Sequence, residues 1–362
     1  MTHSDFDSFR PPEPARRRRA AGKRGPGRRN NGDGSREMSM VPEPEFTSYY
    51  GRPVVKPAPW GDDVALYLFL GGVAGGSALL GLGGQLTGRP TLRRNARLSA
   101  LTAVSLGAVA LVKDLGRPER FLNMLRTFKV TSPMSVGSWT LSAFSAGTAV
   151  SAMAEIDRMS GARLPLGPVR KVLQAVEGPA GFEAALFAGP LAAYTAVLLG
   201  ATATPTWNAA HEELPFVFVS SAALASSGLA MITTPVHEAG PARKLAAFGV
   251  LGDLVATRVM EHRMDPVAAE PLHQGKAGAM LKWSERLAVA GGLGSLLAGR
   301  NRAVAAASGV ALLAASALTR FGVFEAGLAS ARDPRFTIEP QKNRLADRRA
   351  AGVTGDSITT AG

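Results

Sequence analysis

Four long stretches without a charged residue constrain this chain more than any other feature. They hold 23, 25, 27 and 23 residues and cover Val64–Leu86, Val130–Ala154, Ala184–Ala210 and Leu214–Val236. A helix of about 20 mainly apolar residues crosses the roughly 30 Å hydrocarbon core of a bilayer. Each stretch is long enough to span a membrane as a helix. None has the alternating pattern of the strands in a membrane β-barrel.

Four shorter apolar stretches extend this pattern, although charged residues interrupt or bound them. They are Leu98–Val112, Leu245–Thr257, Leu287–Gly299 and Ala303–Thr319. All eight together predict an all-α fold, a polytopic membrane bundle of about eight transmembrane helices, with seven or nine as alternatives. The stretches are rich in Gly and Ala, which let helix backbones pack closely in a membrane.

The charged residues gather at the two ends of the chain. Residues 1–62 carry 20 of them and residues 332–362 carry 10, out of 41 basic and 28 acidic residues. We therefore divide the chain into a disordered basic tail at 1–48, a transmembrane domain at 49–331 and a polar, disordered C-terminal tail at 332–362. The Arg16–Arg19 run is either solvated or attracted to anionic membrane lipid. Outside this tail we find no basic, aromatic-interleaved surface, so we expect no nucleic acid partner.

The Lys and Arg residues of the short loops indicate how the chain is oriented. The loops on one side carry 12 of these residues, and the side that shares the termini carries 10. Because the more positive loops stay in the cytoplasm, this small excess favours a multi-pass protein of the cell membrane with its termini outside. The basic tail favours the opposite orientation.

The cysteine and histidine content limits which metal and haem cofactors this chain could ligate. The chain has no Cys and five His. It therefore has no thiolate zinc site and no cysteine-ligated iron–sulfur cluster. The histidines fall in the tail, in loops or at helix ends, and no pair faces the interior of the helices as a haem anchor requires. We expect a chain without haem or metal, which receives its electrons from a partner.

Three carboxyl groups within or near the spans are candidate proton carriers: Asp114, Glu183 and Asp253. A charge at the bilayer centre is costly, so such groups form ion pairs, stay protonated or serve a function. Asp114 ranks first, because it precedes a Gly116-Arg117-Pro118 turn in which Arg117 lies three residues away. A proton path and simple pairing between helices both remain open for Asp253.

Five segments carry a resemblance to a known family. They are Tyr67–Gly76, Asp114–Phe121, Ser132–Trp139, Tyr194–Gly200 and Pro205–Asn208. With these segments, most of residues 49–330 resembles the NrfD/PsrC family, the membrane subunits of polysulfide-reductase-like and related molybdopterin oxidoreductases.

This resemblance implies a haem-free subunit that binds a quinone, menaquinone in our interpretation, near one membrane face. A ferredoxin-like iron–sulfur subunit would dock on that face and exchange electrons with a molybdopterin catalytic subunit. Such a chain is the quinone-reactive part of an oxidoreductase complex of anaerobic respiration rather than an enzyme by itself.

The resemblance also implies a quinone site, which is the expected location of the chemistry. Tyr67 stands where the family has a quinone-contacting His, and Asp63 is next to Val64, which replaces a family Asn. Tyr194 corresponds to a family tyrosine near the quinone. Asp114 and Arg117 complete the predicted site. A secondary transporter and a structural membrane anchor remain as alternatives, and the substrate of the catalytic partner stays open.

Overall fold

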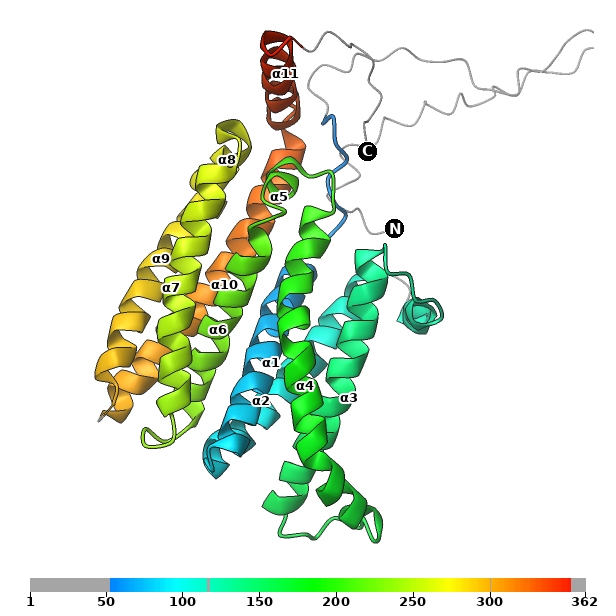
Figure 1. Ribbon diagram of the computed structural model, residues 1–362, viewed down its shortest axis with the longest axis vertical. Coiled ribbons are helices and arrows are strands. Elements are labelled where there is room, and N and C mark those ends of the chain that lie inside the picture. The colour runs from blue at the N-terminus through cyan, green and yellow to red at the C-terminus, as the bar shows by residue number, and fades with distance from the viewer. Residues whose placement is uncertain (1–52, 116–117, 300, 353–362) are drawn as a thin grey trace, which may run out of the picture. The chain divides into compact units, whose positions relative to one another are not determined.

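The computed structural model describes residues 53–115, 118–299 and 301–352, and within these ranges the chain is helical and has no strand. Eight of the described helices contain at least 20 residues (Figure 1): α1 Asp62–Leu86, α2 Pro90–Asp114, α3 Pro133–Met159, α4 Val169–Gly200, α6 Leu214–Thr233, α7 Gly240–Arg263, α9 Gly275–Leu297 and α10 Arg302–Arg332. Four short elements connect or follow them: η2 Pro118–Leu125, α5 Pro205–Ala209, α8 Pro266–His273 and α11 Arg335–Ala350.

Each of the eight predicted spans overlaps one of the eight long helices, so the expected membrane bundle is confirmed. The span predicted at Ala184–Ala210 is shifted, because α4 begins at Val169 and ends at Gly200 and α5 follows it. Helices α1, α2, α4, α6 and α10 are apolar and long enough to cross a membrane by themselves. Helices α3, α7 and α9 contain 27, 24 and 23 residues, long enough to run beside them. At 1.5 Å per residue, each exceeds about 30 Å in length.

Local sequence signals explain where several helices begin. Ser132 precedes Pro133, and its hydroxyl oxygen accepts a hydrogen bond from the Ser135 amide at 3.4 Å. Asn301 caps α10 in the same way, accepting from the Ala303 amide at 2.9 Å. Such caps satisfy backbone amides that the first turn of a helix leaves without partners.

Small residues set how closely the helices approach. Helices α6 and α10 cross at Gly228 and Gly309, where a Cβ atom added to either glycine would lie 2.5 Å from the carbonyl oxygen of the other. A methyl group at either position would push the two helices apart. At this crossing, the glycines of the apolar stretches allow two helix backbones to approach closely.

The predicted disordered C-terminal tail is corrected in part, because α11 occupies most of it. Asp333 accepts a hydrogen bond from the Arg335 amide at 2.9 Å, and Arg335 pairs with Glu339 at 3.1 Å, one turn further on. Phe336 and Pro340 are buried on one side of this otherwise polar helix. The predicted basic tail at 1–48 lies outside the described residues.

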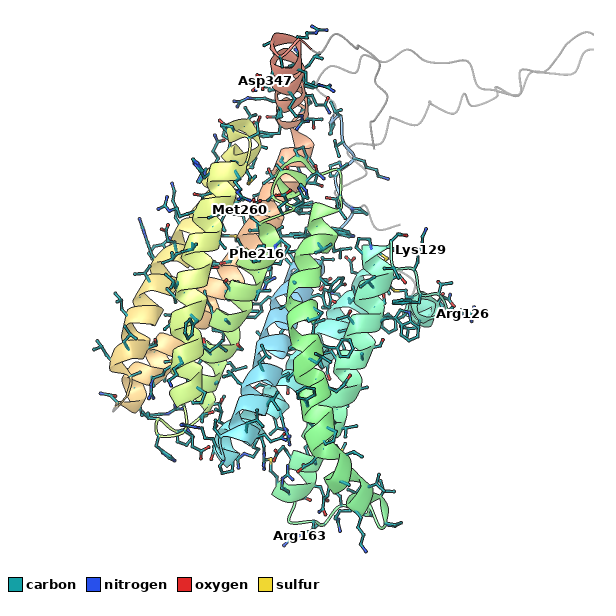
Figure 2. All side chains as sticks on the ribbon, viewed as in Figure 1. Arg126, Lys129, Arg163, Phe216, Met260 and Asp347 are labelled. Carbon is teal, nitrogen blue, oxygen red and sulfur yellow. The ribbon has the colours of Figure 1, made fainter. Side chains whose placement is uncertain are left out.

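The two ends of the bundle differ in the elements they carry. Helices α5, α8 and α11 lie at one end, together with the start of α1 and the start of α3 (Figure 1). Figure 2 labels Arg126 and Lys129 beside the start of α3 and Arg163 at the opposite end. We call the end that carries α5, α8 and α11 the α11 end. Helix α2 also ends there, at Asp114.

Candidate functional site

Two tyrosines from distant parts of the sequence meet inside the bundle. Tyr67 of α1 and Tyr194 of α4 place their hydroxyl oxygens 3.3 Å apart, so one hydroxyl donates a hydrogen bond to the other. Tyr67 is only 2% exposed. The ring of Tyr67 packs 3.5 Å from where a Cβ of Gly107 would stand, and a Cβ on Gly137 would overlap the ring of Tyr194. Glycines on α2 and α3 therefore make room for both rings.

The tyrosine pair borders a cavity formed by α1, α2, η2, α3 and α4, which we call the tyrosine cavity. It contains about 730 Å³ of space, part of it open to the surroundings. Its lining is mostly apolar and consists of Trp60, Val64, Tyr67, Leu111, Asp114, Leu115, Phe121, Met124, Leu125, Met134, Ser138, Leu141, Ser142, Tyr194 and Leu198. Small-molecule sites likewise combine apolar walls with a few polar groups.

Asp114 brings a carboxyl group to the tyrosine cavity. It is the last residue of α2, is partly exposed, and interacts with the backbone amide of Gly61, just before α1. The cavity therefore holds two tyrosine hydroxyls in its wall and one acidic group near the end of the bundle. The predicted members Tyr67, Tyr194 and Asp114 come together here.

Asp63, another predicted quinone ligand, is not among the described residues that line this cavity. Asp63 forms an ion pair with Lys113 at 3.1 Å, which joins the start of α1 to the end of α2, while its neighbour Val64 faces the cavity. A pair with such an exposed lysine contributes little stability. Arg117, together with the predicted Asp114–Arg117 pair, lies outside the described residues.

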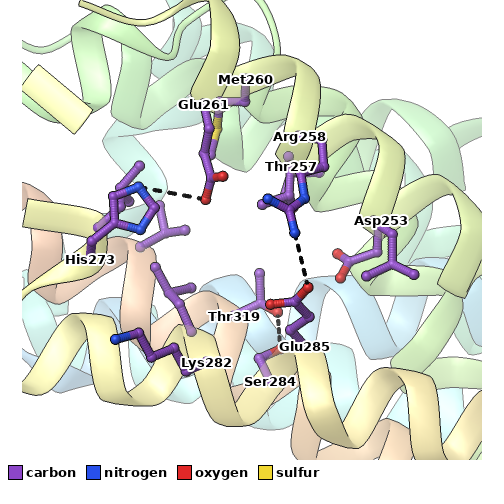
Figure 3. A pocket seen from close by; sticks show the side chains of 15 residues that line it. Asp253, Thr257, Arg258, Met260, Glu261, His273, Lys282, Ser284, Glu285 and Thr319 are labelled. Atoms are coloured by element: carbon purple, nitrogen blue, oxygen red, sulfur yellow. Dashed lines mark hydrogen bonds and ion pairs between the residues drawn. The ribbon is translucent and has the colours of Figure 1, made fainter. Parts of the chain in front are cut away.

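The other two predicted proton carriers lie elsewhere in the bundle. Glu183 of α4 packs against Gly147 of α3, where the missing Cβ leaves space for its carboxyl group. Asp253 of α7 borders a second cavity, which is lined by charged residues and which we call the charged cavity (Figure 3). The structure therefore separates Asp114, Glu183 and Asp253 into three locations.

Arg320 is a functional candidate that is not among the site residues predicted from the sequence. Its side chain is completely buried in α10. Its guanidinium lies 3.8 Å from the centre of the Phe218 ring and donates hydrogen bonds to the Phe218 carbonyl and, at 3.5 Å, to the Thr195 hydroxyl. An arginine inside an apolar span was the available signal, but its surroundings could not be read from the sequence.

Aromatic side chains connect the tyrosine cavity to the short helix α5. Trp60, which lines the cavity, stacks on Trp207 with ring centres 5.9 Å apart. Trp207 is buried, and its indole nitrogen donates a hydrogen bond to the Val323 carbonyl at 2.8 Å. The tilted ring of Phe324 lies on Trp207 as well, with ring centres 5.6 Å apart. This cluster fixes the wall of the cavity near the α11 end.

The part of the chain that the structure describes contains no group of three or more His, Cys, Asp or Glu side chains that could hold a metal ion. The polar groups of the tyrosine cavity are hydroxyls and a carboxyl group, which suit hydrogen bonding and proton exchange with an organic ligand.

Comparison with known protein families identifies the fold. A family model described as "Polysulphide reductase, NrfD" matches residues 54–260, which is more than half of the chain. The chain belongs to the NrfD family. No curated protein matches it.

The matched region relates differently to the two cavities of this NrfD protein. Every lining residue of the tyrosine cavity falls between positions 60 and 198, inside the match. The charged cavity begins in the matched region with Val217 and Asp253 and continues beyond it into α8, α9 and α10. The tyrosine cavity therefore lies wholly within the segment that matches the family model.

Proposed function

We propose that this chain is a haem-free integral membrane subunit that exchanges electrons between the quinone pool and an iron–sulfur partner subunit of a molybdopterin oxidoreductase complex. Membership of the NrfD family supports the general role. The observation that carries the proposal is the tyrosine pair, which faces a largely apolar cavity next to the Asp114 carboxyl group.

The tyrosine cavity fits the chemistry of a quinone, which is a flat ring with two carbonyl groups and an apolar tail. Phe121, Met124 and Leu141 offer apolar surface to the ring and the tail. The two tyrosine hydroxyls carry two protons, and the bond between them uses one. The second hydroxyl proton is free to donate to a ligand carbonyl. Tyr67 and Tyr194 would therefore hold the head group of the quinone, in our proposal menaquinone.

Reduction of a bound quinone takes up two electrons and two protons. Asp114 could transfer a proton, because it lines the cavity and is also partly exposed, as the last residue of α2. Carboxyl groups of this kind transfer protons efficiently when they lie within hydrogen-bond reach or one water molecule away. Glu183 and Asp253 do not line this cavity, and we assign the local proton step to Asp114.

The electrons must come from another subunit, because a chain without cysteine cannot ligate an iron–sulfur cluster through thiolates. We place the docking surface of a ferredoxin-like iron–sulfur subunit at the α11 end, next to the tyrosine cavity. The molybdopterin subunit would bind to that partner and carry the catalytic step. We further propose that this face, with the termini, lies outside the cell membrane.

A tagged form of the full chain, isolated in mild detergent, tests this proposal. Mass spectrometry of the associated proteins and of the extracted lipids should identify an iron–sulfur subunit, a molybdopterin subunit and a quinone. A stable chain that carries neither partners nor quinone would contradict the proposal. Solute flux through the isolated chain in liposomes would then support the transporter alternative.

A quinone-analogue assay on the isolated complex separates a reactive subunit from a mere anchor. The complex should exchange electrons with the analogue, and substitution of Tyr67 and Asp114 should reduce the rate. Unchanged turnover in both variants would support a structural anchor.

A further inference from the structure

The charged cavity lies in the second half of the bundle and differs in character from the tyrosine cavity. It contains about 880 Å³ of space, part of it open, between α6, α7, α8, α9 and α10. Its walls carry six titratable side chains from three helices: Asp253, Arg258, Glu261, His273, Lys282 and Glu285. Such a concentration of charge in a membrane bundle indicates a surface in contact with water rather than with lipid.

Asp253 forms the deep end of this cavity. It lies ten residues before the last residue of α7, which corresponds to about 15 Å along the helix axis. Its side chain is buried, with the residue 5% exposed, and its Oδ1 atom has no hydrogen-bond partner among the described residues. Figure 3 shows the carboxyl group directed into the space that Glu285 and Arg258 face from the other side.

Other polar groups line the cavity between Asp253 and the α11 end. Arg258 pairs with Glu285 at 3.6 Å, and His273 approaches Glu261 at 3.9 Å (Figure 3). Next to Glu285, the Ser284 hydroxyl forms a hydrogen bond with the Thr319 hydroxyl at 2.7 Å. Glu261 and His273 lie near the ends of α7 and α8, so the polar lining extends from the interior to the surface.

Arg320 is fully buried in α10, and its positive charge and the negative charge of Asp253 attract each other. Its guanidinium is also 3.1 Å from where a Cβ of Gly72 in α1 would stand, and it donates to Thr195, the neighbour of Tyr194 in α4. Arg320 therefore lies between the charged cavity and the helices that carry the tyrosine pair.

We propose that the charged cavity is a water-accessible proton-entry site, in which Asp253 exchanges protons with water and holds the proton opposite Arg320. Uptake moves one proton from water to Asp253 Oδ1 and removes the negative charge that balances Arg320. Negative charge arriving elsewhere near Arg320 would favour this uptake. The exchange itself is independent of the quinone site, and only its coupling to quinone reduction rests on the proposed function.

The absence of cysteine from the chain gives a direct test of water access. Ser284→Cys, in the cavity wall, should react in the intact complex with a small water-soluble methanethiosulfonate reagent. Ser316→Cys is the matched control, because Ser316 is equally buried, bonds Ser221 at 2.8 Å and lines neither cavity. Thr257→Cys provides a second cavity position. Equal, negligible reaction at all three positions would overturn the proposal.

The carboxyl group of Asp253 can be tested in the unaltered complex. Dicyclohexylcarbodiimide reacts with protonated carboxyl groups in apolar surroundings, so mass spectrometry should find the adduct on Asp253, and less of it as the pH rises. Asp253→Asn should lack the adduct and still retain bound quinone, while its quinone turnover falls about tenfold. An unmodified Asp253 at every pH would contradict the proposal. Labelling of Asp253 in a complex without quinone would contradict only the proposed function.

Discussion

The two cavities of this protein show two ways of using polar groups inside a membrane bundle. The tyrosine cavity has mostly apolar walls, and its buried polar groups are neutral hydroxyls that bond to each other. The charged cavity places several ionised groups together and leaves one buried carboxylate oxygen without a partner. The first arrangement suits a neutral organic ligand, while the second requires water. A buried polar group is stable only when it is paired or hydrated, which explains the difference.

A substitution of Arg320 should affect both cavities, because Arg320 interacts with Asp253 and also contacts Thr195 of α4. Arg320→Met removes a buried cation and leaves Asp253 uncompensated, which should lower the free energy of unfolding by about 3–5 kcal/mol. Thermal unfolding in detergent measures this loss. The Asp253→Asn/Arg320→Met double variant should recover part of it, since neither charge then lacks its partner. Fully additive losses would show that the two side chains are independent.

A substitution of Gly137 should alter the tyrosine cavity alone. Gly137→Ala places a methyl group in the space of the Tyr194 ring, and such overpacking costs about 1–3 kcal/mol. Quinone turnover should fall about tenfold, whereas carbodiimide labelling of Asp253 should not change. Gly71→Ala is the matched control, because its added Cβ meets no atom within 4 Å. Loss of Asp253 labelling in Gly137→Ala would mean that the cavities are not separate.

Removal of the hydroxyl group of Tyr67 or of Tyr194 tests whether these residues bind the quinone. Tyr67→Phe and Tyr194→Phe should each weaken quinone binding by about 3- to 10-fold, which is the effect of one lost hydrogen bond. The double variant should lose less than the product of the two, because the hydroxyls share one bond. Titration with a quinone analogue measures these affinities. Unchanged affinity in both single variants would place the ligand elsewhere.

Glu238 provides a comparison at the end of the bundle opposite α11, away from both cavities. Its carboxylate accepts hydrogen bonds from the Thr91 and Leu92 amides at 2.8 and 3.0 Å, at the start of α2. Burial raises the pKa of Glu238, but these hydrogen bonds outweigh it and hold the pKa below its ordinary value. The stabilisation is therefore complete above the unfolded pKa of about 4.3 and disappears as the pH falls through the lower folded pKa.

We expect Glu238→Gln to lower the free energy of unfolding at pH 7 by an amount typical of a lost helix cap, about 0.5–2 kcal/mol, and to lower the melting temperature accordingly. The difference between the variant and the native protein should shrink as the pH falls below 4. Melting curves at several pH values measure it, and a difference that does not change with pH would show that the charge of Glu238 has no role.

The sequence by itself determined the membrane fold and the positions of the helices. Span length and hydropathy are local properties, because each helix satisfies its own backbone hydrogen bonds in the bilayer. The Ser132 cap was predictable for the same reason. The C-terminal tail was predicted less well, because its polar composition hid the local pairing of Arg335 with Glu339 and the buried Phe336.

Only the tertiary structure decided which predicted site residues meet. Tyr67 and Tyr194 are 127 positions apart, and their contact depends on the glycines of α2 and α3 that make space for their rings. The same packing directs Asp63 to Lys113 rather than into the cavity. It also brings Arg320 of α10 and Asp253 of α7 close enough for their opposite charges to attract each other. Hydropathy sets the depth of a residue in the membrane, but the rotation and neighbours of its helix follow from packing between distant segments.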